Sequence, residues 1–256
     1  MAIVTLLTDA GESDHYIAAI KARILSVHPD TRIVDISHQI RMFDIGHAAY
    51  VLRSVFREFP KGTAHLVGVD AAGNRGDAFI IAEIEGHFFI GPDNGLFSLL
   101  SDNPPGKVWE IRSENPNSTT FPEKEIFAQA AARVARGDDP SEVGKPLSDI
   151  KRLTDRQIKA TKRQITGHIL RVDHYGNLIT NIPKQVFEIL SKDKGYTIQF
   201  GGEKFRRIHT GYNQAEQGEC FIVFNSQDFL EIGIYKGNAS ELLGLGYDSV
   251  VNIIFE

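Results

Sequence analysis

Carboxylate side chains follow one another closely near the start of the chain. The stretch Thr5–Tyr16, TLLTDAGESDHY, carries Asp9, Glu12 and Asp14 between an apolar segment and a helical pattern. Carboxylates accept hydrogen bonds from hydroxyl and ammonium groups, and they repel phosphate. The corresponding turn of a nucleotide site is usually rich in glycine and binds phosphate through backbone N–H groups. The sequence therefore predicts a neutral or cationic ligand that carries hydroxyl groups.

Other polar residues stand where predicted strands end. Asp70 follows the apolar run His65–Val69 and precedes a loop that carries Arg75. Its carboxylate either faces a ligand crevice or serves the loop itself, for example as a helix cap. Further along, DHYGN at 173–177 and NSQ at 225–227 interrupt apolar strands. These two segments either read a heterocycle through their donors and acceptors or form ordinary tight turns.

The acidic turn joins a predicted strand to a predicted helix. Apolar residues fill the strand, and Ile17, Ile20, Ile24 and Val27 recur at helical spacing, with Ser13 as the expected N-cap. Strand and helix patterns then alternate, with strands at Arg32–Ile36, His65–Val69, Phe79–Ile84, His87–Ile90 and Lys107–Ile111 and helices near Asp44–Phe56 and Ile126–Arg136. This alternation predicts an α/β domain with a mostly parallel sheet and flanking helices. The acidic turn then lies in the crevice at the carboxyl ends of the strands, where ligands of such sheets usually bind.

The second part of the chain has a different pattern. After a polar, basic segment near Ser148–Arg163, which we interpret as a solvated linker, short strands alternate with turns. The strands are expected at Ile165–Val172, Leu178–Ile182, Tyr196–Phe200, Cys220–Asn225, Leu230–Tyr235 and Val250–Phe255, and one helix at Gln185–Leu190. We therefore expect two domains, an α/β domain at 1–163 that ends in the linker and an all-β, barrel-like domain at 164–256.

Composition excludes several classes of protein. The formal net charge of −5 argues against nucleic-acid binding. No apolar run approaches the ~20 residues that a membrane span needs, and the first residues lack the basic region of a signal peptide. Cys220 is the only cysteine, and the nine histidines show no metal-ligand spacing, so neither a disulfide nor a metal site is predicted. A cytoplasmic protein is expected.

Taken in order, the polar clusters resemble one family, the S-adenosyl-L-methionine hydroxide adenosyltransferases, which are related to the enzymes that make 5′-fluoro- and 5′-chloro-adenosine. The motifs that carry the resemblance are TLLTD-G-SD-Y at 5–16, VDISHQI–FDI at 34–45, GPDNGL at 91–96, VDHYGNLITNI at 172–182 and NS-x₃-LEI-x₄-GNA at 225–239. Several long motifs in the same order are far more specific than any one of them. The resemblance implies an N-terminal α/β domain joined to a C-terminal β-barrel. It also implies homotrimers whose sites lie between the N-domain of one subunit and the C-domain of the next.

The resemblance further implies a role for each candidate side chain toward S-adenosyl-L-methionine (SAM). It assigns the ribose hydroxyls to Asp9, the methionine ammonium to Asp14 and Asp173, the methionine carboxylate to Ser226, the adenine edge to Asn177 and the backbone near Ala239, the adenine face to Tyr212 and the pocket wall to Phe43. The halogenating relatives have an arginine where this chain has Gln227. SAM is expected as the substrate, without a further cofactor.

The family reaction is displacement at the ribose C5′ by water or hydroxide, which yields adenosine and L-methionine. Members that use water carry an Asp–Arg–His set. Asp70 matches the aspartate, and Arg75, in a shortened loop, is the substitute for the arginine. The family run Thr-Phe-His-Gly-Arg-Asp reads TFPEKE at 120–125, so Pro122 stands in the place of the histidine. Proline has neither a titratable group nor a backbone N–H.

These residues leave four hypotheses. The first is an active SAM hydrolase in which Asp70, with help from Arg75 or Glu123, positions or deprotonates water. The second, motivated by Pro122, is a binding or regulatory protein that keeps the pocket and has lost the chemistry. The third is a halogenase, which the Asp70 carboxylate disfavours because it would repel a halide. The fourth is an α/β domain with an unrelated sugar or nucleoside ligand.

Overall fold

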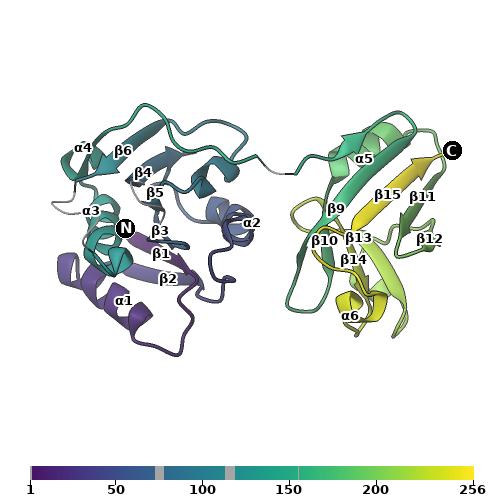
Figure 1. Ribbon diagram of the computed structural model, residues 1–256, viewed down its shortest axis with the longest axis horizontal. Helices are drawn as coiled ribbons and strands as arrows, with labels where there is room; N and C mark the ends of the chain where they lie inside the picture. The colour runs from purple at the N-terminus through teal and green to yellow at the C-terminus, as the bar shows by residue number, and fades with distance from the viewer. Residues whose placement is uncertain (1, 73–77, 113–118, 155) are drawn as a thin grey trace. The chain divides into compact units, whose positions relative to one another are not determined.

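The computed structural model describes residues 2–72, 78–112, 119–154 and 156–256. The chain divides into two compact units, Met1–Thr154 and Asp155–Glu256 (Figure 1). The division falls before the end of the basic segment that we expected to be a linker. Lys159 and Ala160 form the short strand β8 (Lys159–Ala160), which pairs with the first long strand of the second unit, and Ile158 packs against the core of that unit.

The first unit is built on one mixed sheet of seven strands in the order β2-β1-β3-β5-β4-β6-β7. Its strands are β1 (Ile3–Thr8), β2 (Arg32–Ser37), β3 (Ala64–Gly68), β4 (Phe79–Ile84), β5 (His87–Pro92), β6 (Lys107–Ile111) and β7 (Gly144–Pro146). The four strands β2, β1, β3 and β5 are parallel, and the pairings beyond β5 are antiparallel. The change of direction follows from the tight Glu85–Gly86 turn, where both residues have positive φ, because such a turn joins antiparallel neighbours. The predicted α/β architecture is confirmed.

Helices cover both faces of this sheet (Figure 1). Helices α1 (Tyr16–Val27) and α3 (Ala128–Arg136) pack on one face, and α2 (Ile45–Val55) packs on the other. Alternate residues of β1 supply the two cores, since Val4 and Leu6 join the α1–α3 core while Leu7 joins the α2 core. Strand β1 lies between β2 and β3 in the sheet. The chain passes from β1 to β2 on one side, and the connection after β2 then crosses over to β3 on the other side. The carboxyl ends of β1 and β3 therefore form the switch point of the sheet.

The first two helices begin in different ways. Helix α1 begins at Tyr16 after the N-cap residue His15, whose side chain makes no capping hydrogen bond, so the prediction that Ser13 caps this helix is wrong. The extra residues of the acidic turn separate Ser13 from the first helical turn. Helix α2 has a regular cap, in which the Asp44 side chain accepts the backbone N–H of His47 at 2.9 Å.

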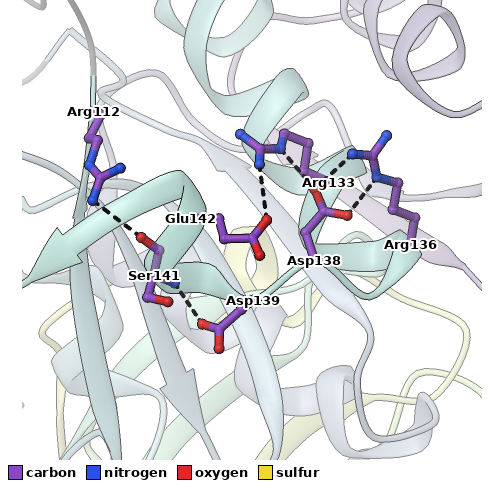
Figure 2. Close-up of polar contacts among 7 residues, drawn as sticks. All are labelled: Arg112, Arg133, Arg136, Asp138, Asp139, Ser141 and Glu142. Carbon is purple, nitrogen blue, oxygen red and sulfur yellow. Dashed lines mark hydrogen bonds and ion pairs between the residues drawn. The ribbon is translucent and has the colours of Figure 1, made fainter.

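A turn of π-helix, η4 (Glu123–Phe127), leads directly into α3. At the far end of α3, Asp138 accepts hydrogen bonds from Arg133 and Arg136 (Figure 2). The bonds from Arg136 and Arg133 lower the pKa of Asp138 to about 2, so this carboxylate stays charged at neutral pH. The network closes the C-terminal end of α3, and the π-turn η4, which begins with Glu123, lies at the opposite end of the helix.

The second unit is an antiparallel sheet that curls around a main apolar core, with a smaller cluster of Ala215, Phe221 and Val223 beside it (Figure 1). The strands run in the order β12-β11-β15-β9-β10-β14-β13, with β8 paired to β9 outside this path. They are β9 (Gln164–Val172), β10 (Leu178–Pro183), β11 (Tyr196–Phe200), β12 (Glu203–Phe205), β13 (Cys220–Phe224), β14 (Phe229–Ile234) and β15 (Val250–Phe255). Because β12 and β13 are the ends of the order, the unit is an open, barrel-like sheet, and the predicted all-β fold is confirmed.

The remaining helices of the described residues are short. They are α4 (Pro140–Val143), α5 (Lys184–Ser191), α6 (Ala239–Leu243), η1 (Phe56–Glu58), η2 (Leu96–Leu99) and η5 (Tyr212–Gln214). In the described ranges, none of the helices has the length and apolar character required to cross a membrane.

Candidate active site

The Asp9 side chain joins the segments that meet at the switch point of the first unit. Its Oδ2 atom accepts the backbone N–H of Phe43 at 2.9 Å and that of Asp70 at 3.3 Å. Its own backbone N–H donates to the carbonyl of Gly68, the last residue of β3, at 3.3 Å. Asp9 is therefore held by backbone contacts at the carboxyl ends of β1 and β3, as its position after a buried strand predicted.

Asp70 adopts a backbone conformation that few residues with a side chain take. Its φ is +48°, in the left-handed region, where aspartate and asparagine are tolerated better than other non-glycine residues. The carbonyl of the preceding Val69 accepts a hydrogen bond from the side-chain amide of Asn94 at 3.1 Å. Strained conformations of this kind persist where surrounding contacts impose them, and they cluster at functional sites. Arg75, the predicted partner of Asp70, lies outside the described residues.

Two more predicted contacts of the first unit are exposed. Phe43 also has a positive φ, +63°, and 70% of its surface is accessible, so its ring is available to a ligand while its N–H holds Asp9. Asp14 lies exposed in the bend that precedes α1. The Asp14 carboxylate is therefore accessible to an ammonium group, and the resemblance implies that it binds the methionine ammonium.

A further carboxyl group, that of Glu123, packs against the end of β3. A Cβ atom added to Gly68 would lie 2.7 Å from Cγ of Glu123 and 3.4 Å from its Oε1. Burial is the main cause that raises the pKa of Glu123 to about 7. The hydrogen bond from its own backbone N–H lowers this pKa, and the nearby charge of Asp9 raises it. A carboxyl group with this pKa gains and loses a proton near neutral pH, which suits acid–base chemistry.

In the second unit, Asp173 organises the turn between β9 and β10. Its Oδ1 accepts the backbone N–H groups of Tyr175 at 2.9 Å and of Asn177 at 2.8 Å, and its Oδ2 accepts the Asn177 side-chain amide at 3.3 Å. Gly176 takes φ +83°, which completes the turn. The tight turn predicted at 173–177 is confirmed, and the contact of its donors and acceptors with a heterocycle stays a prediction.

The start of α6 lies beside this turn. The backbone N–H of Ser240 donates to the carbonyl of Gly176 at 2.9 Å, and Ala239, the first residue of α6, is completely buried. A Cβ on Gly176 would come within 2.1 Å of the Asn238 side-chain oxygen, so the glycine allows this close approach. The structure thereby brings Asn177 and Ala239 together, two residues that are distant in sequence and that the resemblance assigns to one ligand edge.

Glu231, a residue to which the sequence analysis assigned no role, connects this turn to neighbouring strands. It is 3% exposed, and burial raises its pKa, with a further increase from Asp173; hydrogen bonds to Asn225, Tyr212 and Asn177 lower it. The signal for Glu231 was present in the sequence, since it is the only charged residue in the apolar run FLEIGI of β14.

Tyr212 and Ser226 lie at the exposed border of the same unit. The Tyr212 ring meets the edge of Phe221 at a centroid distance of 5.2 Å and is half exposed. Ser226 is exposed on the turn between β13 and β14, which the Asn225 side chain closes by accepting the N–H of Gln227 at 3.0 Å. Glu231 forms hydrogen bonds with Tyr212, Asn177 and Asn225 and so connects these three residues. Ser226 follows Asn225 in the chain and is therefore adjacent to this group.

An α/β unit with carboxyl groups at its switch point, followed by an open antiparallel sheet with a polar turn, defines a two-domain α/β–β class of protein. Both halves match family models, the SAM hydroxide adenosyltransferase N-terminal domain at residues 4–144 and the corresponding C-terminal domain at residues 167–252. The chain belongs to the SAM hydroxide adenosyltransferase family.

Similar proteins cover three quarters or more of the chain. An (R)-S-adenosyl-L-methionine hydrolase of Methanocaldococcus jannaschii is 32% identical over 269 residues, covering 99% of this chain and 96% of the relative. A fluorinase of Nocardia brasiliensis is 28% identical and covers 75% of each chain. Among solved structures, an uncharacterized conserved protein from Thermotoga maritima superposes with a TM-score of 0.88 at 28% identity, covering 98% of this chain and 99% of its own.

Proposed function

We propose that this protein is a SAM hydrolase that forms adenosine and L-methionine. The observation that carries the proposal is the match of both family domains, together with the 32% identity to an (R)-S-adenosyl-L-methionine hydrolase over almost the entire length of both chains. The acidic turn agrees with such a substrate, because SAM has a ribose diol, an ammonium group and a sulfonium charge, and it has no phosphate.

The reaction requires little acid catalysis. The sulfonium sulfur leaves with the electron pair of the C5′–S bond as the neutral thioether of methionine, while the water oxygen forms a bond to C5′ and loses a proton. The protein has to place the water in line with the C5′–S bond and exclude competing water. We assign the positioning of this water to Asp70, with no cofactor, and keep Arg75 as its expected partner.

The names of several relatives specify the (R) epimer at sulfur. We therefore propose that this chain also prefers the (R) epimer. Inversion at sulfur exchanges the directions of the methyl and methionine groups, so a site that holds both ribose and ammonium distinguishes the two epimers by shape. The ribose contact is assigned to Asp9 and the ammonium contacts to Asp14 and Asp173.

The remaining ligand contacts belong to the same proposal. Asn177 and the backbone at Ala239 read the adenine edge, Tyr212 and Phe43 contact the ligand's apolar parts, and Ser226 meets the methionine carboxylate. We propose a homotrimer in which unit 1 of one subunit and unit 2 of the next complete each site. Support comes from the family resemblance and from the two polar clusters, one in each unit. A cytoplasmic location stays a prediction from the sequence.

Product analysis tests the function. The purified protein is incubated separately with (R)- and (S)-SAM, and adenosine and methionine are quantified by chromatography, with Asp70→Ala as the comparison. Equal amounts of the two products, formed faster from the (R) epimer, are expected. Binding of adenosine without turnover of either epimer would instead identify the binding protein of the second hypothesis. A 5′-halo-adenosine formed in the presence of chloride or fluoride would identify a halogenase.

A further inference from the structure

We propose that Glu123 is the group that takes the proton from the attacking water, a role that rests on the proposed hydrolysis. One water O–H bond breaks and its proton goes to the Glu123 carboxylate; the oxygen bonds to C5′, and the C5′–S electron pair leaves with the sulfur. Glu123 then releases the proton to solvent. Adenosine, methionine and one proton are the products.

The packing of Glu123 places its carboxyl group at the carboxyl ends of the central strands. Its Cγ and Oε1 occupy the space that a side chain at residue 68 would fill, and Thr8 closes the same space, with Cγ2 at 3.3 Å from the position of the absent Cβ. Glu123 is also the first residue of the π-turn η4, a distortion found frequently at functional sites. The glycine therefore makes room for the Glu123 carboxyl group beside Gly68, whose carbonyl accepts the backbone N–H of Asp9 at 3.3 Å.

The electrostatic surroundings suit a base. Burial raises the pKa of Glu123 to about 7, and Asp9 is the charged neighbour that adds to this increase. A carboxylate with a raised pKa is a stronger base than an ordinary one, and close to neutral pH much of it remains ionised. Of the other two carboxylates, Asp9 already accepts two backbone N–H groups, and Asp70 belongs to the strained end of β3.

The charged groups on neighbouring elements are directed elsewhere. Arg23 of α1 gathers with Lys124 and Glu125, the exposed residues that follow Glu123. Tyr16 of α1 meets Phe121 edge-on.

The other elements that pack against η4 carry charges at a distance. His65 of β3 and His87 of β5 contact Phe56 on the opposite face of the sheet. Arg133 and Arg136 of α3 bind Asp138 at the far end of the helix (Figure 2). His38 is a further titratable group at this end of the sheet; it hydrogen-bonds to Thr8 at 2.9 Å and lies 3.1 Å from Asp35. The Glu123→Gln variant decides whether a titration near pH 7 in the reaction belongs to Glu123.

The test is the pH dependence of SAM hydrolysis by three full-length proteins. In the wild type, kcat/KM is expected to rise tenfold per pH unit below about 7 and to level off above it. Glu123→Gln is expected to lower kcat about 100-fold or more and to remove this rise. The affinity of Glu123→Gln for adenosine, measured by calorimetry, is expected to lie within about twofold of the wild-type value. This binding also shows that the variant is folded. Glu125→Gln, the same change at an exposed position of the same turn, serves as the control and keeps wild-type kinetics.

A second variant does not alter the carboxyl group itself. Gly68→Ala introduces a Cβ that displaces the Glu123 side chain, so kcat is expected to fall more than tenfold while adenosine still binds. If the wild type hydrolyses SAM and Glu123→Gln does so at the same rate with the same pH profile, the role of Glu123 is overturned and the proposed function stands. If the wild type forms no products from either epimer, both fail. If Glu123→Gln does not fold, Gly68→Ala decides alone, and a wild-type rate in that variant overturns the role.

Discussion

The Asp9 carboxylate accepts the backbone N–H of Asp70 across the ends of two adjacent strands, at 3.3 Å, with the same oxygen that accepts the N–H of Phe43 at 2.9 Å. One side chain therefore ties the end of β1 to the end of β3 and to the loop before α2. A change at Asp9 affects both the charge of the site and the conformation of the two residues it holds.

Replacing Asp9 by asparagine tests the charge. Asn keeps one oxygen acceptor of the same size and loses the negative charge, and hydrogen bonds to charged groups contribute about 1 kcal/mol more than neutral ones. We expect adenosine, which offers two ribose hydroxyls, to bind Asp9→Asn about tenfold more weakly by calorimetry. Glu12→Gln, a matched change at an exposed position of the same turn, should leave the affinity unchanged. Equal affinities for Asp9→Asn and the wild type would exclude the ribose contact.

Two replacements of Asp70 separate its backbone role from its side-chain role. Asparagine tolerates φ of +48°, whereas alanine in the left-handed region costs roughly 1–2 kcal/mol. Both variants should lose about 10- to 100-fold in kcat because neither can orient water with a carboxylate. In urea unfolding, Asp70→Ala alone should show reduced stability. A wild-type kcat in Asp70→Asn would contradict the assignment of the water to this carboxylate.

The contact of Gly233 with Asn177 predicts a specific loss of adenine binding. A Cβ at residue 233 would lie 2.0 Å from Cζ of Phe221 and 2.6 Å from Oδ1 of Asn177, so Gly233→Ala has to displace one or both. We expect weaker adenosine binding and a loss of about 1–3 kcal/mol in the free energy of unfolding. Gly246→Ala is the control, since nothing lies within 4 Å of its added Cβ. Because Phe221 alone can move in Gly233→Ala, Asn177→Ala gives the decisive result, and an unchanged adenosine affinity in that variant would remove Asn177 from the adenine site.

Mixing two inactive variants tests the proposed sites between subunits. Asp9→Ala disables unit 1, and Asn177→Ala disables unit 2. If each site combines unit 1 of one subunit with unit 2 of the next, random reassembly of equal amounts restores about a quarter of the sites in a closed ring. Hydrolysis is measured after mixing under conditions that allow subunit exchange, and the mass of the assembly is measured by light scattering. Activity no greater than that of the separate variants would show that each site lies within one chain.

A buried pair of histidines predicts how the stability of unit 1 depends on pH. His65 bonds to Thr5 at 2.7 Å and to His87 at 3.3 Å, and burial, with a contribution from His87, lowers the pKa of His65 to about 3. The unfolded chain takes up this proton below about pH 6.5, and the folded chain does not. The free energy of unfolding should therefore fall between pH 6.5 and 3, by up to about 1.4 kcal/mol per pH unit from His65.

Denaturant unfolding at several pH values checks this slope. His65→Gln removes the titrating ring and should flatten the dependence in that range. His15→Gln, at an exposed position of the same unit, should keep the wild-type slope. An identical slope in His65→Gln would show that other groups determine the acid sensitivity.

Much of the fold could be predicted because its signals are local. The apolar residues of β1 and the helical spacing of Ile17, Ile20 and Ile24 identify their elements without knowledge of any distant residue. The apolar runs Phe79–Ile84 and His87–Ile90 likewise identify two strands from local sequence alone. The start of α1 was predicted too early, directly after Ser13. Serine is a suitable N-cap residue, but its presence does not show how many turn residues follow before the helix begins. The short helix α6 was not predicted, since its five residues carry too little periodicity.

The sequence by itself determined the chemistry that the site offers, namely carboxylates at Asp9 and Asp70 and an amide at Asn177, together with the strands that these residues follow. Only the tertiary structure decided which of them meet and how a group such as Glu123 behaves. Glu123 is 55 residues from Gly68 in the chain, yet the absence of a side chain at Gly68 makes room for its carboxyl group. Its pKa of about 7 results from burial and from the Asp9 charge, and both depend on packing between distant segments rather than on neighbours in sequence.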